Sequence, residues 1–334
     1  MSSSADGLRL GTRDSELALY QARMVAALLQ AKDPTLNVEL VAYKTQGDRF
    51  LDASFVQLSR QGMTGVFVKE LEQALLSGEI DLAVHSMKDM PSQLPEGLTT
   101  HSIGFREDPR DVLLLPDGKM IGNMQELPSG SRIGTSSARR VAQLKRLSPN
   151  WQFEAIRGNL QTRLRKLDES GGYDALVLAA AGVHRLGWES RIACYLNPFS
   201  TMVPAPAQGI VAVEYRTDNT QLAKRLSACQ VPAVAVMAYV ERSVMRLVEG
   251  GCQLPLGVFA HWPVEDDTFS PWNACLGQIN TQTPLQVTAC LLSPDGQHYR
   301  EAKTACWVEP ADTLEESCER LWPVVQSLAA QLRA

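Results

Sequence analysis

Short apolar runs alternate with amphipathic stretches over the first hundred residues. The spacing of the apolar positions predicts strands over 8–11, 37–43 and 80–85, with helices over 16–30 and 67–77 between them. Ser15 stands just before the first helix, where a hydroxyl group can accept a hydrogen bond from a free backbone N–H. Alternation of strand and helix favours a parallel or mixed sheet that is covered by helices.

The same alternation restarts after Asp108-Pro109-Arg110. It predicts strands over 112–115, 132–134, 153–156 and 175–178, with helices over 138–147 and 160–168. The proline-containing stretch 201–208 is typical of a connection between lobes, and 211–215 has the pattern of a strand that returns to the first sheet. Two α/β lobes are therefore expected.

The pattern changes from about residue 226. A helix is predicted over 233–248, ended by Gly250-Gly251, then antiparallel strands near 285–292 and 304–308, and a closing helix over 314–332. Strands and helices that are grouped rather than alternating indicate an α+β arrangement. The chain is thus predicted to end in a smaller α+β domain.

Length and composition narrow the class of protein. A chain of 334 residues is too long for one ordinary core, which favours two or three domains. The first seven residues lack the basic and apolar regions of a targeting peptide, and no apolar run has the length of a membrane span, so we expect a cytoplasmic protein. Seven cysteines without paired or metal-type spacing argue against a disulfide framework and against a metal site; most should be buried, reduced and inert.

Charge is distributed unevenly along the chain. The net charge is −5, yet residues 106–204 hold fourteen Arg or Lys against ten Asp or Glu, so this segment is +4 and the rest is −9. A basic middle within an acidic protein favours a local anion site over a surface that coats a polyanion. We therefore expect a small anionic ligand, and neither nucleic acid nor a membrane as a partner.

Cationic and hydroxyl side chains of the basic segment cluster where predicted strands end. Ligands bind at that edge in open α/β sheets, and the N-terminus of the following helix favours an anion. One such arginine is usually a solvated surface residue, but several together, each with a fork of donors that matches a carboxylate, favour a ligand with several carboxylates. The side chains are Ser136, Arg139 and Arg140 after the second-lobe strand 132–134, Arg157 and Arg163 after 153–156, and Arg185 after 175–178.

An acid and a base also follow a strand in the first lobe. Lys88 and Asp89 come directly after the apolar strand that ends at His85. A simple surface ion pair is the usual role of such neighbours. At the carboxyl end of a strand, however, this pair is well placed for proton transfer or for stabilising a cationic intermediate. Arg13 and Ser15, in the first strand-to-helix turn, are expected to face the same cleft.

Cys252 lies in the unusual sequence EGGCQLPLG (249–257). Two glycines give an open turn after a helix, with the thiol at its tip. A cysteine without special chemistry is the more common occupant of such a loop. An exposed thiol that faces arginines would instead have a lowered pKa and good nucleophilicity.

Eight motifs together resemble the hydroxymethylbilane synthase (porphobilinogen deaminase) family, in the same order and at similar separations over roughly residues 8–262. They are RLGTRDSELAL (9–19), FVKELEQALL (67–76), DLAVHSMKDMP (81–91), REDPRDV (106–112), IGTSSARR (133–140), RGNLQTRLRKLD (157–168), ESRI (189–192) and EGGCQLPLG (249–257). The resemblance implies two periplasmic-binding-protein-like α/β lobes that flank a cleft, a third domain that carries a cofactor, and a monomer. The implied boundaries are residues 8–105 with 206–225, 106–205, and 226–334.

The resemblance also implies an activity in tetrapyrrole biosynthesis. Members of the family are transferases that condense four porphobilinogen molecules head to tail, each losing ammonia, and water then releases hydroxymethylbilane. The product would pass to uroporphyrinogen-III synthase. A dipyrromethane cofactor, assembled from substrate, would be joined by a thioether to Cys252, and Asp89 would be the catalytic carboxylate. The substrate and cofactor carboxylates would be bound by Arg13, Ser15, Lys88, Ser136, Arg139, Arg140, Arg157, Arg163 and Arg185.

The sequence departs from the family pattern in two places. The lid loop usually carries a Gly-Gly-Lys-Gly-type run, whereas Met63 and Thr64 stand here, with Arg60 at another basic position. Ala207 replaces the first glycine of a Gly-Gln-Gly segment. These changes bear on lid behaviour and rate more than on the type of reaction.

Three alternatives stay open at this stage. They are a family member with reduced or lost activity that acts as a two-lobed anion-binding protein, a solute-binding protein of the same fold, and a phosphate-handling enzyme. The missing signal peptide and the Cys252 loop count against a solute-binding protein, and the chain has no glycine-rich phosphate loop. Pyrrole attached to Cys252 and turnover of porphobilinogen would distinguish these possibilities.

Overall fold

The computed structural model describes residues 7–44, 68–169, 171–248, 254–263 and 278–333. The chain forms two compact units, residues 1–104 with 210–231 and residues 105–209 with 232–334. Within the described ranges, no helix is both long enough and apolar enough to cross a membrane.

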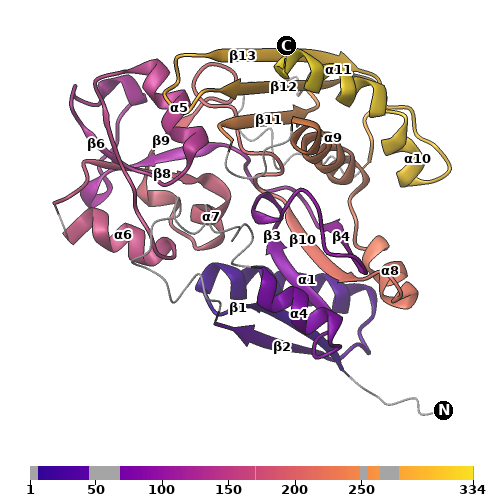
Figure 1. The fold of residues 1–334 in the computed structure, drawn as a ribbon. Helices are drawn as coiled ribbons and strands as arrows, with labels where there is room; N and C mark the ends of the chain where they lie inside the picture. The colour runs from indigo at the N-terminus through magenta and orange to yellow at the C-terminus, as the bar shows by residue number, and fades with distance from the viewer. Residues whose placement is uncertain (1–6, 45–67, 170, 249–253, 264–277, 334) are drawn as a thin grey trace, which may run out of the picture. The chain divides into compact units, whose positions relative to one another are not determined.

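The first unit contains a mixed five-stranded sheet in the order β2-β1-β3-β10-β4 (Figure 1). Its strands are β1 (Leu8–Arg13), β2 (Val38–Tyr43), β3 (Leu82–Ser86), β4 (Leu98–Ile103) and β10 (Val211–Arg216). β1 is parallel to both of its neighbours, whereas β10 is antiparallel to β3 and β4. The prediction that 211–215 rejoins the first sheet is confirmed.

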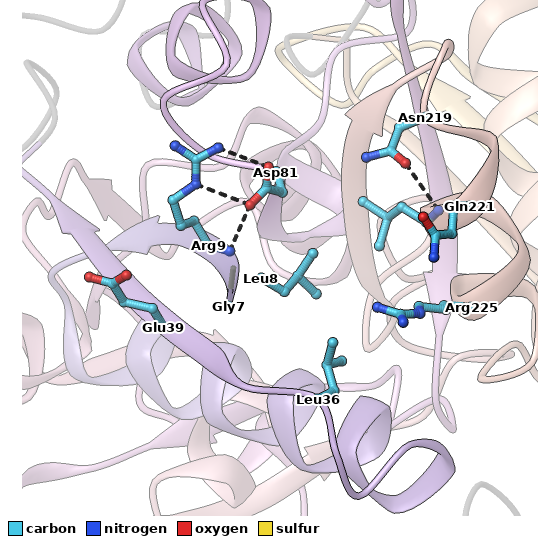
Figure 2. A pocket seen from close by; sticks show the side chains of 10 residues that line it. Gly7, Leu8, Arg9, Leu36, Glu39, Asp81, Asn219, Gln221 and Arg225 are labelled. Atoms are coloured by element: carbon cyan, nitrogen blue, oxygen red, sulfur yellow. Dashed lines mark hydrogen bonds and ion pairs between the residues drawn. The ribbon is translucent and has the colours of Figure 1, made fainter. Parts of the chain in front are cut away.

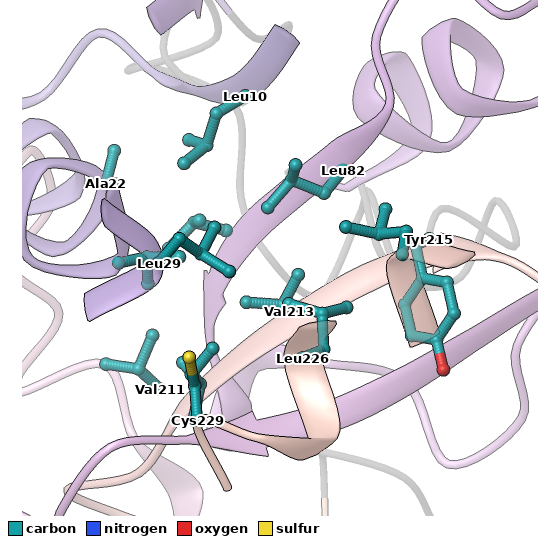
Figure 3. Packing of buried hydrophobic residues seen from close by; sticks show 13 residues of the cluster. Leu10, Ala22, Leu29, Leu82, Val211, Val213, Tyr215, Leu226 and Cys229 are labelled. Atoms are coloured by element: carbon teal, nitrogen blue, oxygen red, sulfur yellow. The ribbon is translucent and has the colours of Figure 1, made fainter. Parts of the chain in front are cut away.

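Helices cover both faces of this sheet. They are α1 (Glu16–Lys32), α4 (Lys69–Leu76) and α8 (Thr220–Ser227), with a 3-10 turn at Met87–Asp89. Side chains of α1 and α8, such as Leu29 and Leu226, pack with Leu82 and Val213 in one core (Figure 3). The opposite face, represented by Ala83, packs against α4. Successive strand residues thus enter different cores, as the period of two requires.

The second unit contains a five-stranded sheet in the order β7-β6-β8-β5-β9. Its strands are β5 (Asp111–Leu114), β6 (Arg132–Gly134), β7 (Gln152–Glu154), β8 (Ala175–Ala179) and β9 (Ile192–Leu196). Its helices are α5 (Ala138–Leu147), α6 (Leu160–Glu169) and α7 (Ala180–Arg185), with 3-10 turns at Pro116–Gly118, Met124–Glu126 and Glu189–Arg191. β6 is parallel to β7 and β8, so these three strands share a carboxyl edge.

The same unit ends in a smaller antiparallel sheet, β11-β12-β13, packed with helices (Figure 1). The elements are α9 (Pro232–Val248), β11 (Leu256–His261), β12 (Leu285–Leu292), β13 (Tyr299–Cys306), α10 (Leu314–Glu319) and α11 (Trp322–Arg333). The predicted fold class, two α/β lobes and a smaller C-terminal α+β domain, is therefore confirmed. The residue boundaries of the three domains stay a prediction.

Two predictions for the C-terminal part were wrong. The strand expected at 304–308 covers 299–306, because it pairs along its whole length with β12, from Leu285↔Cys306 to Leu292↔Tyr299. The helix expected at 314–332 is two helices. Pro323, at the second position of α11, has no N–H to donate to a preceding turn, which favours a new helix start there.

The segment that leaves the second unit contains two residues with left-handed backbone. Ala207 has φ 59°, and its N–H donates to the Glu241 carboxylate at 2.5 Å. Gly209 has φ 90°, and a Cβ at this position would lie 2.2 Å from the carbonyl oxygen of Glu107. The close approach of the two chain segments therefore requires glycine at 209.

Gly209→Ala is expected to destabilise the protein by roughly 2–4 kcal/mol, because it adds both backbone strain and a clash with main-chain atoms. Gly187→Ala is the matched control. Gly187 also has positive φ, 68°, but a Cβ there would meet nothing within 4 Å. Urea unfolding of both variants measures the difference. Equal losses of stability would show that the approach of Glu107 to Gly209 is unimportant.

Candidate functional site

The carboxyl edge of the first sheet brings together three of the predicted site residues. Arg13 is the last residue of β1, and Lys88 and Asp89 lie in the 3-10 turn directly after β3. Because β1 and β3 are adjacent and parallel, these ends meet at one edge of the sheet. Asp89 is exposed, whereas Arg13 and Lys88 are half-buried. Ser15 is nearby in the chain, and its hydroxyl accepts a hydrogen bond from Ala18 N, which confirms the predicted cap.

The turn that carries Asp89 is anchored by buried groups. Gln21 of α1 is 3% exposed, and its amide donates to Ser86 Oγ at 3.0 Å and accepts from it at 3.3 Å. Met87 N donates to the carbonyl oxygen of Ile210 at 2.9 Å. The chain is thus held where it enters the turn, while the Asp89 carboxylate faces solvent. Sequence reasoning missed Gln21, although a glutamine on the buried side of an amphipathic helix is a signal for such a contact.

The carboxyl edge of the second sheet carries three strand-to-helix turns. Ser136 Oγ donates to the carbonyl oxygen of Ile156 at 2.7 Å and accepts from its N–H at 3.1 Å, which joins the turns after β6 and β7. Arg163 Nε donates to Gly158 O at 2.8 Å, and Arg157 is half-buried. Arg185, at the end of α7, donates to Gly209 O at 2.8 Å. Ser136, Arg157 and Arg163 therefore lie at this edge, whereas Arg185 lies at the far end of the helix that follows β8. The role of these residues as carboxylate ligands stays a prediction.

Arg139 and Arg140 are buried against a shared carboxylate. Asp111, the first residue of β5, is fully buried and accepts from Arg139 Nη1 at 2.7 Å and from Arg140 Nη2 at 2.7 Å. Gln208 Nε2 donates to the same carboxylate at 3.2 Å. Two guanidinium groups against one carboxylate leave a positive charge at the start of α5. Asp111 and Gln208 were not predicted, because their partners lie far away in the sequence.

The described cysteines are poor nucleophiles. Burial raises the pKa of the Cys194 thiol to about 11 and those of Cys290 and Cys318 to about 12, and it also raises the pKa values of Cys229 and Cys306. None of these five forms a disulfide. They are therefore inert, as expected for most of the cysteines. Cys252 and the lid residues Arg60 and Thr64 lie outside the described residues.

An open pocket of about 600 Å³ lies at the other edge of the first sheet (Figure 2). It is lined near the amino end of β1 by Leu8 and Arg9, and Arg9 is bound to Asp81 at 2.9 Å. Ligands of open α/β sheets bind at the carboxyl ends of strands instead. The pocket contains none of the predicted site residues, and Figure 2 shows its Arg9 paired with Asp81, so we assign no chemistry to it.

A half-buried ion pair joins α7 to the chain segment before β5. His184 Nδ1 lies 3.0 Å from Glu107 Oε1, and His184 Nε2 lies 2.9 Å from the Tyr195 hydroxyl. The hydrogen bond to Glu107 raises the pKa of His184 above its ordinary 6.5. The hydrogen bond to His184 lowers the pKa of Glu107 below its ordinary 4.5. Both shifts favour the charged pair.

Because of these pKa shifts, the ion pair of His184 and Glu107 should stabilise the folded protein only within a limited range of pH. The contribution of His184 is fully present below pH 6.5 and is lost as pH rises through its higher folded pKa. The contribution of Glu107 is present above pH 4.5 and is lost as pH falls through its lower folded pKa. Glu107→Gln should therefore lower Tm most between about pH 4.5 and 6.5, and less at pH 9. A loss of Tm that does not vary between pH 5 and 9 would contradict this.

Comparison with known proteins gives a consistent result. Residues 8–224 match the family model "porphobilinogen deaminase, dipyromethane cofactor binding domain", and residues 233–319 match "porphobilinogen deaminase, C-terminal domain". The porphobilinogen deaminase of Syntrophobacter fumaroxidans is 48% identical over 76% of this chain and 80% of its own. That of Paenibacillus macerans is 41% identical over 88% of this chain and 90% of its own. Among solved structures, a probable amino-acid transporter binding protein of Bacillus subtilis aligns with 68% of this chain and 90% of its own, at 13% identity and a TM-score of 0.40.

Proposed function

The chain belongs to the porphobilinogen deaminase family, and from that premise we propose which of its residues carry the family's reaction. The protein is a transferase of tetrapyrrole biosynthesis, a hydroxymethylbilane synthase. It joins porphobilinogen molecules head to tail with loss of ammonia, and water releases the linear tetrapyrrole. The anchored turn at the carboxyl edge of the first sheet, with Asp89 exposed beside Lys88, is the observation that carries our assignment of the catalytic group.

The cofactor of this family is dipyrromethane, and the chemistry of the second-sheet edge fits it. Dipyrromethane carries acetate and propionate groups, and this edge has Arg157 and Arg163 next to the net positive charge of the Asp111 cluster. When bound, the cofactor supplies the pyrrole α-carbon to which the first substrate unit is joined. We propose that Cys252 holds it through a thioether. The inert thiols of the five described cysteines support an attachment elsewhere.

Each site residue has a distinct role in the proposal. Lys88, Arg13 and Ser15 bind carboxylates of porphobilinogen at the first-sheet edge. Asp89 stabilises the positive charge that develops on the pyrrole as the carbon–nitrogen bond breaks and ammonia leaves. Because the same carboxylate can accept a hydrogen bond from pyrrole N–H, it also orients the reacting ring. The growing chain is bound by Ser136, Arg139, Arg140, Arg157, Arg163 and Arg185.

Arg139 and Arg140 have a particular task in this arrangement. Asp111 fixes both guanidinium groups at the start of α5, so they add a constant positive potential without losing side-chain freedom when an anion binds. A growing chain gains two carboxylates with each unit, and a preorganised cationic edge stabilises every stage. Arg60 and Thr64 are proposed to contact substrate from the lid loop. A cytoplasmic, monomeric enzyme that hands its product to uroporphyrinogen-III synthase completes the proposal.

Turnover of porphobilinogen tests the function directly. The purified protein should release one ammonia per porphobilinogen consumed and one hydroxymethylbilane per four. Binding of porphobilinogen without release of ammonia would instead identify a member of the family that acts as an anion-binding protein. The Thr64 loop is the feature that would then need replacement, by Thr64→Lys together with Met63→Gly.

A further inference from the structure

His184 and Arg185 are adjacent residues that hold the same point of the chain. Arg185 donates to the carbonyl oxygen of Gly209, and the N–H of Glu107 donates to that same oxygen at 3.1 Å. His184 binds the Glu107 side chain. The end of α7 thus fixes two segments, one around Glu107 and one around Gly209. Both lie next to the positions where the chain passes between its two units, 104–105 and 209–210.

The residue after this point is bonded to the catalytic turn. The carbonyl oxygen of Ile210 accepts from Met87 N, at the start of the turn that holds Lys88 and Asp89. The peptide bond between Gly209 and Ile210 therefore connects a residue that is bonded to α7 with the residue that accepts from Met87 N. Met87 N and the Ser86 side chain hold the catalytic turn from its own unit, so the contacts of His184 reach Arg185 and Gly209 without replacing any bond of that turn.

Acidic groups surround His184 on several elements. Glu107 and Asp108 precede β5, Glu189 lies in the 3-10 turn after α7, and each raises the pKa of the imidazole. Tyr195 of β9 keeps its proton, because burial raises its pKa. The nearest cations are Arg110, which stacks on the Tyr195 ring at 4.0 Å and pairs with Asp108, and Arg185, which lowers the pKa of Glu107.

Protonation changes the strength of these contacts and not their existence. A neutral imidazole donates through one nitrogen and accepts through the other, so it can bind Glu107 and Tyr195 together. The imidazolium donates through both nitrogens, and its positive charge adds a direct electrostatic attraction to the Glu107 carboxylate. The hold on Glu107 therefore weakens as His184 loses its proton.

We propose that His184 is a positioning residue for the substrate-binding arginine Arg185, and that its protonation tightens the hold on Glu107 and Gly209. The inference rests on the proposed function, in which Arg185 binds substrate carboxylates. It predicts an effect on the affinity for porphobilinogen, because Arg185 is the group proposed to bind the substrate carboxylates. The chemical step, which depends on Asp89, keeps its rate.

Kinetics from pH 6 to 9 test this with three variants. Between pH 6 and 9, KM for porphobilinogen should rise about two- to fivefold more in the wild type than in His184→Gln, as expected for the loss of a partly exposed ion pair. The ratio of the wild-type kcat to the His184→Gln kcat should stay constant over the same range. Glu107→Gln should give the same profile as His184→Gln, and the double variant should add nothing further. Tyr195→Phe is the matched control: it removes only the hydroxyl group and should keep the wild-type dependence on pH. Equal KM profiles for wild type and His184→Gln would overturn the proposal.

A readout without turnover separates this inference from the proposed function. The His184 ring proton resonance, identified by its loss in His184→Gln, should titrate above pH 6.5 in the wild type and closer to 6.5 in Glu107→Gln. The Glu107 amide should exchange with solvent faster in His184→Gln than in wild type at pH 6. A His184 ring that titrates at or below pH 6.5 in the wild type, together with unchanged exchange of the Glu107 amide, would refute the proposed positioning role of His184 even in an active enzyme. Failure to turn over porphobilinogen would refute the function alone.

Discussion

Replacing Asp89 with alanine is expected to lower porphobilinogen turnover by about 10²–10⁴-fold, the range for losing a positioned acid–base or charge-stabilising group. The carboxylate is the group proposed to offset positive charge as ammonia leaves. Because Asp89 is exposed, the free energy of unfolding should change by less than about 0.5 kcal/mol. Ammonia release and urea unfolding of the same preparation measure both effects.

Two further variants make the result interpretable. Asp89→Asn keeps the size and one acceptor oxygen but removes the charge, so it should lose nearly as much activity as the alanine variant. Asp312→Ala removes an exposed carboxylate that has no place in the proposed site and should keep full activity. If Asp89→Ala retains more than a tenth of wild-type turnover, Asp89 is not the catalytic carboxylate.

Asp111→Asn is expected to destabilise the protein by about 3–5 kcal/mol, the usual cost of removing one partner from a buried ion pair. The neutral amide would remove the carboxylate charge that the buried Arg139 and Arg140 guanidinium groups share. It would also turn one acceptor into a donor that faces guanidinium N–H groups. Urea unfolding at pH 7 measures the loss.

Asp174→Asn is the matched control for this variant. Asp174 also pairs with an arginine, Arg132, but the two side chains are 47% and 38% exposed, so the change should cost less than about 1 kcal/mol. A loss below 1 kcal/mol for Asp111→Asn would show that the cluster is not held by this charge. The preorganised cationic edge would then lack its structural basis.

Most elements that the sequence predicted have strong local signals. The run Ala175–Ala179 is buried along its whole length, and the apolar spacing of residues 16–30 matches α1. β4, β9 and β11 were missed, as were the helices α7 and α8. Thr99–His101 of β4 are polar residues on an edge strand, so β4 lacks the pattern of a central strand. β9 and β11 are short apolar edge strands, and a short apolar run alone does not distinguish a strand from a buried helix segment.

In the candidate site, too, some residues could be predicted from local sequence and others could not. Asp89 and the arginines were found because strand ends in parallel sheets meet at one edge. The residues that hold them were not found. Arg106 and Glu241 form a buried pair at 2.7 Å, and burial raises the pKa of Glu241, yet 135 positions separate the two in the chain. Only the folded arrangement reveals such pairs, because each of these residues alone has the sequence pattern of a surface charge.

The intact mass of the purified protein, measured beside that of its Cys252→Ala variant, shows whether a cofactor is attached at Cys252. The wild type should exceed its sequence mass by two linked pyrrole units, and the variant should not. Incubation with porphobilinogen should then add further units to the wild type only. An unmodified wild-type mass that persists after incubation with porphobilinogen or hydroxymethylbilane would show that the chain has the fold of its family without its chemistry.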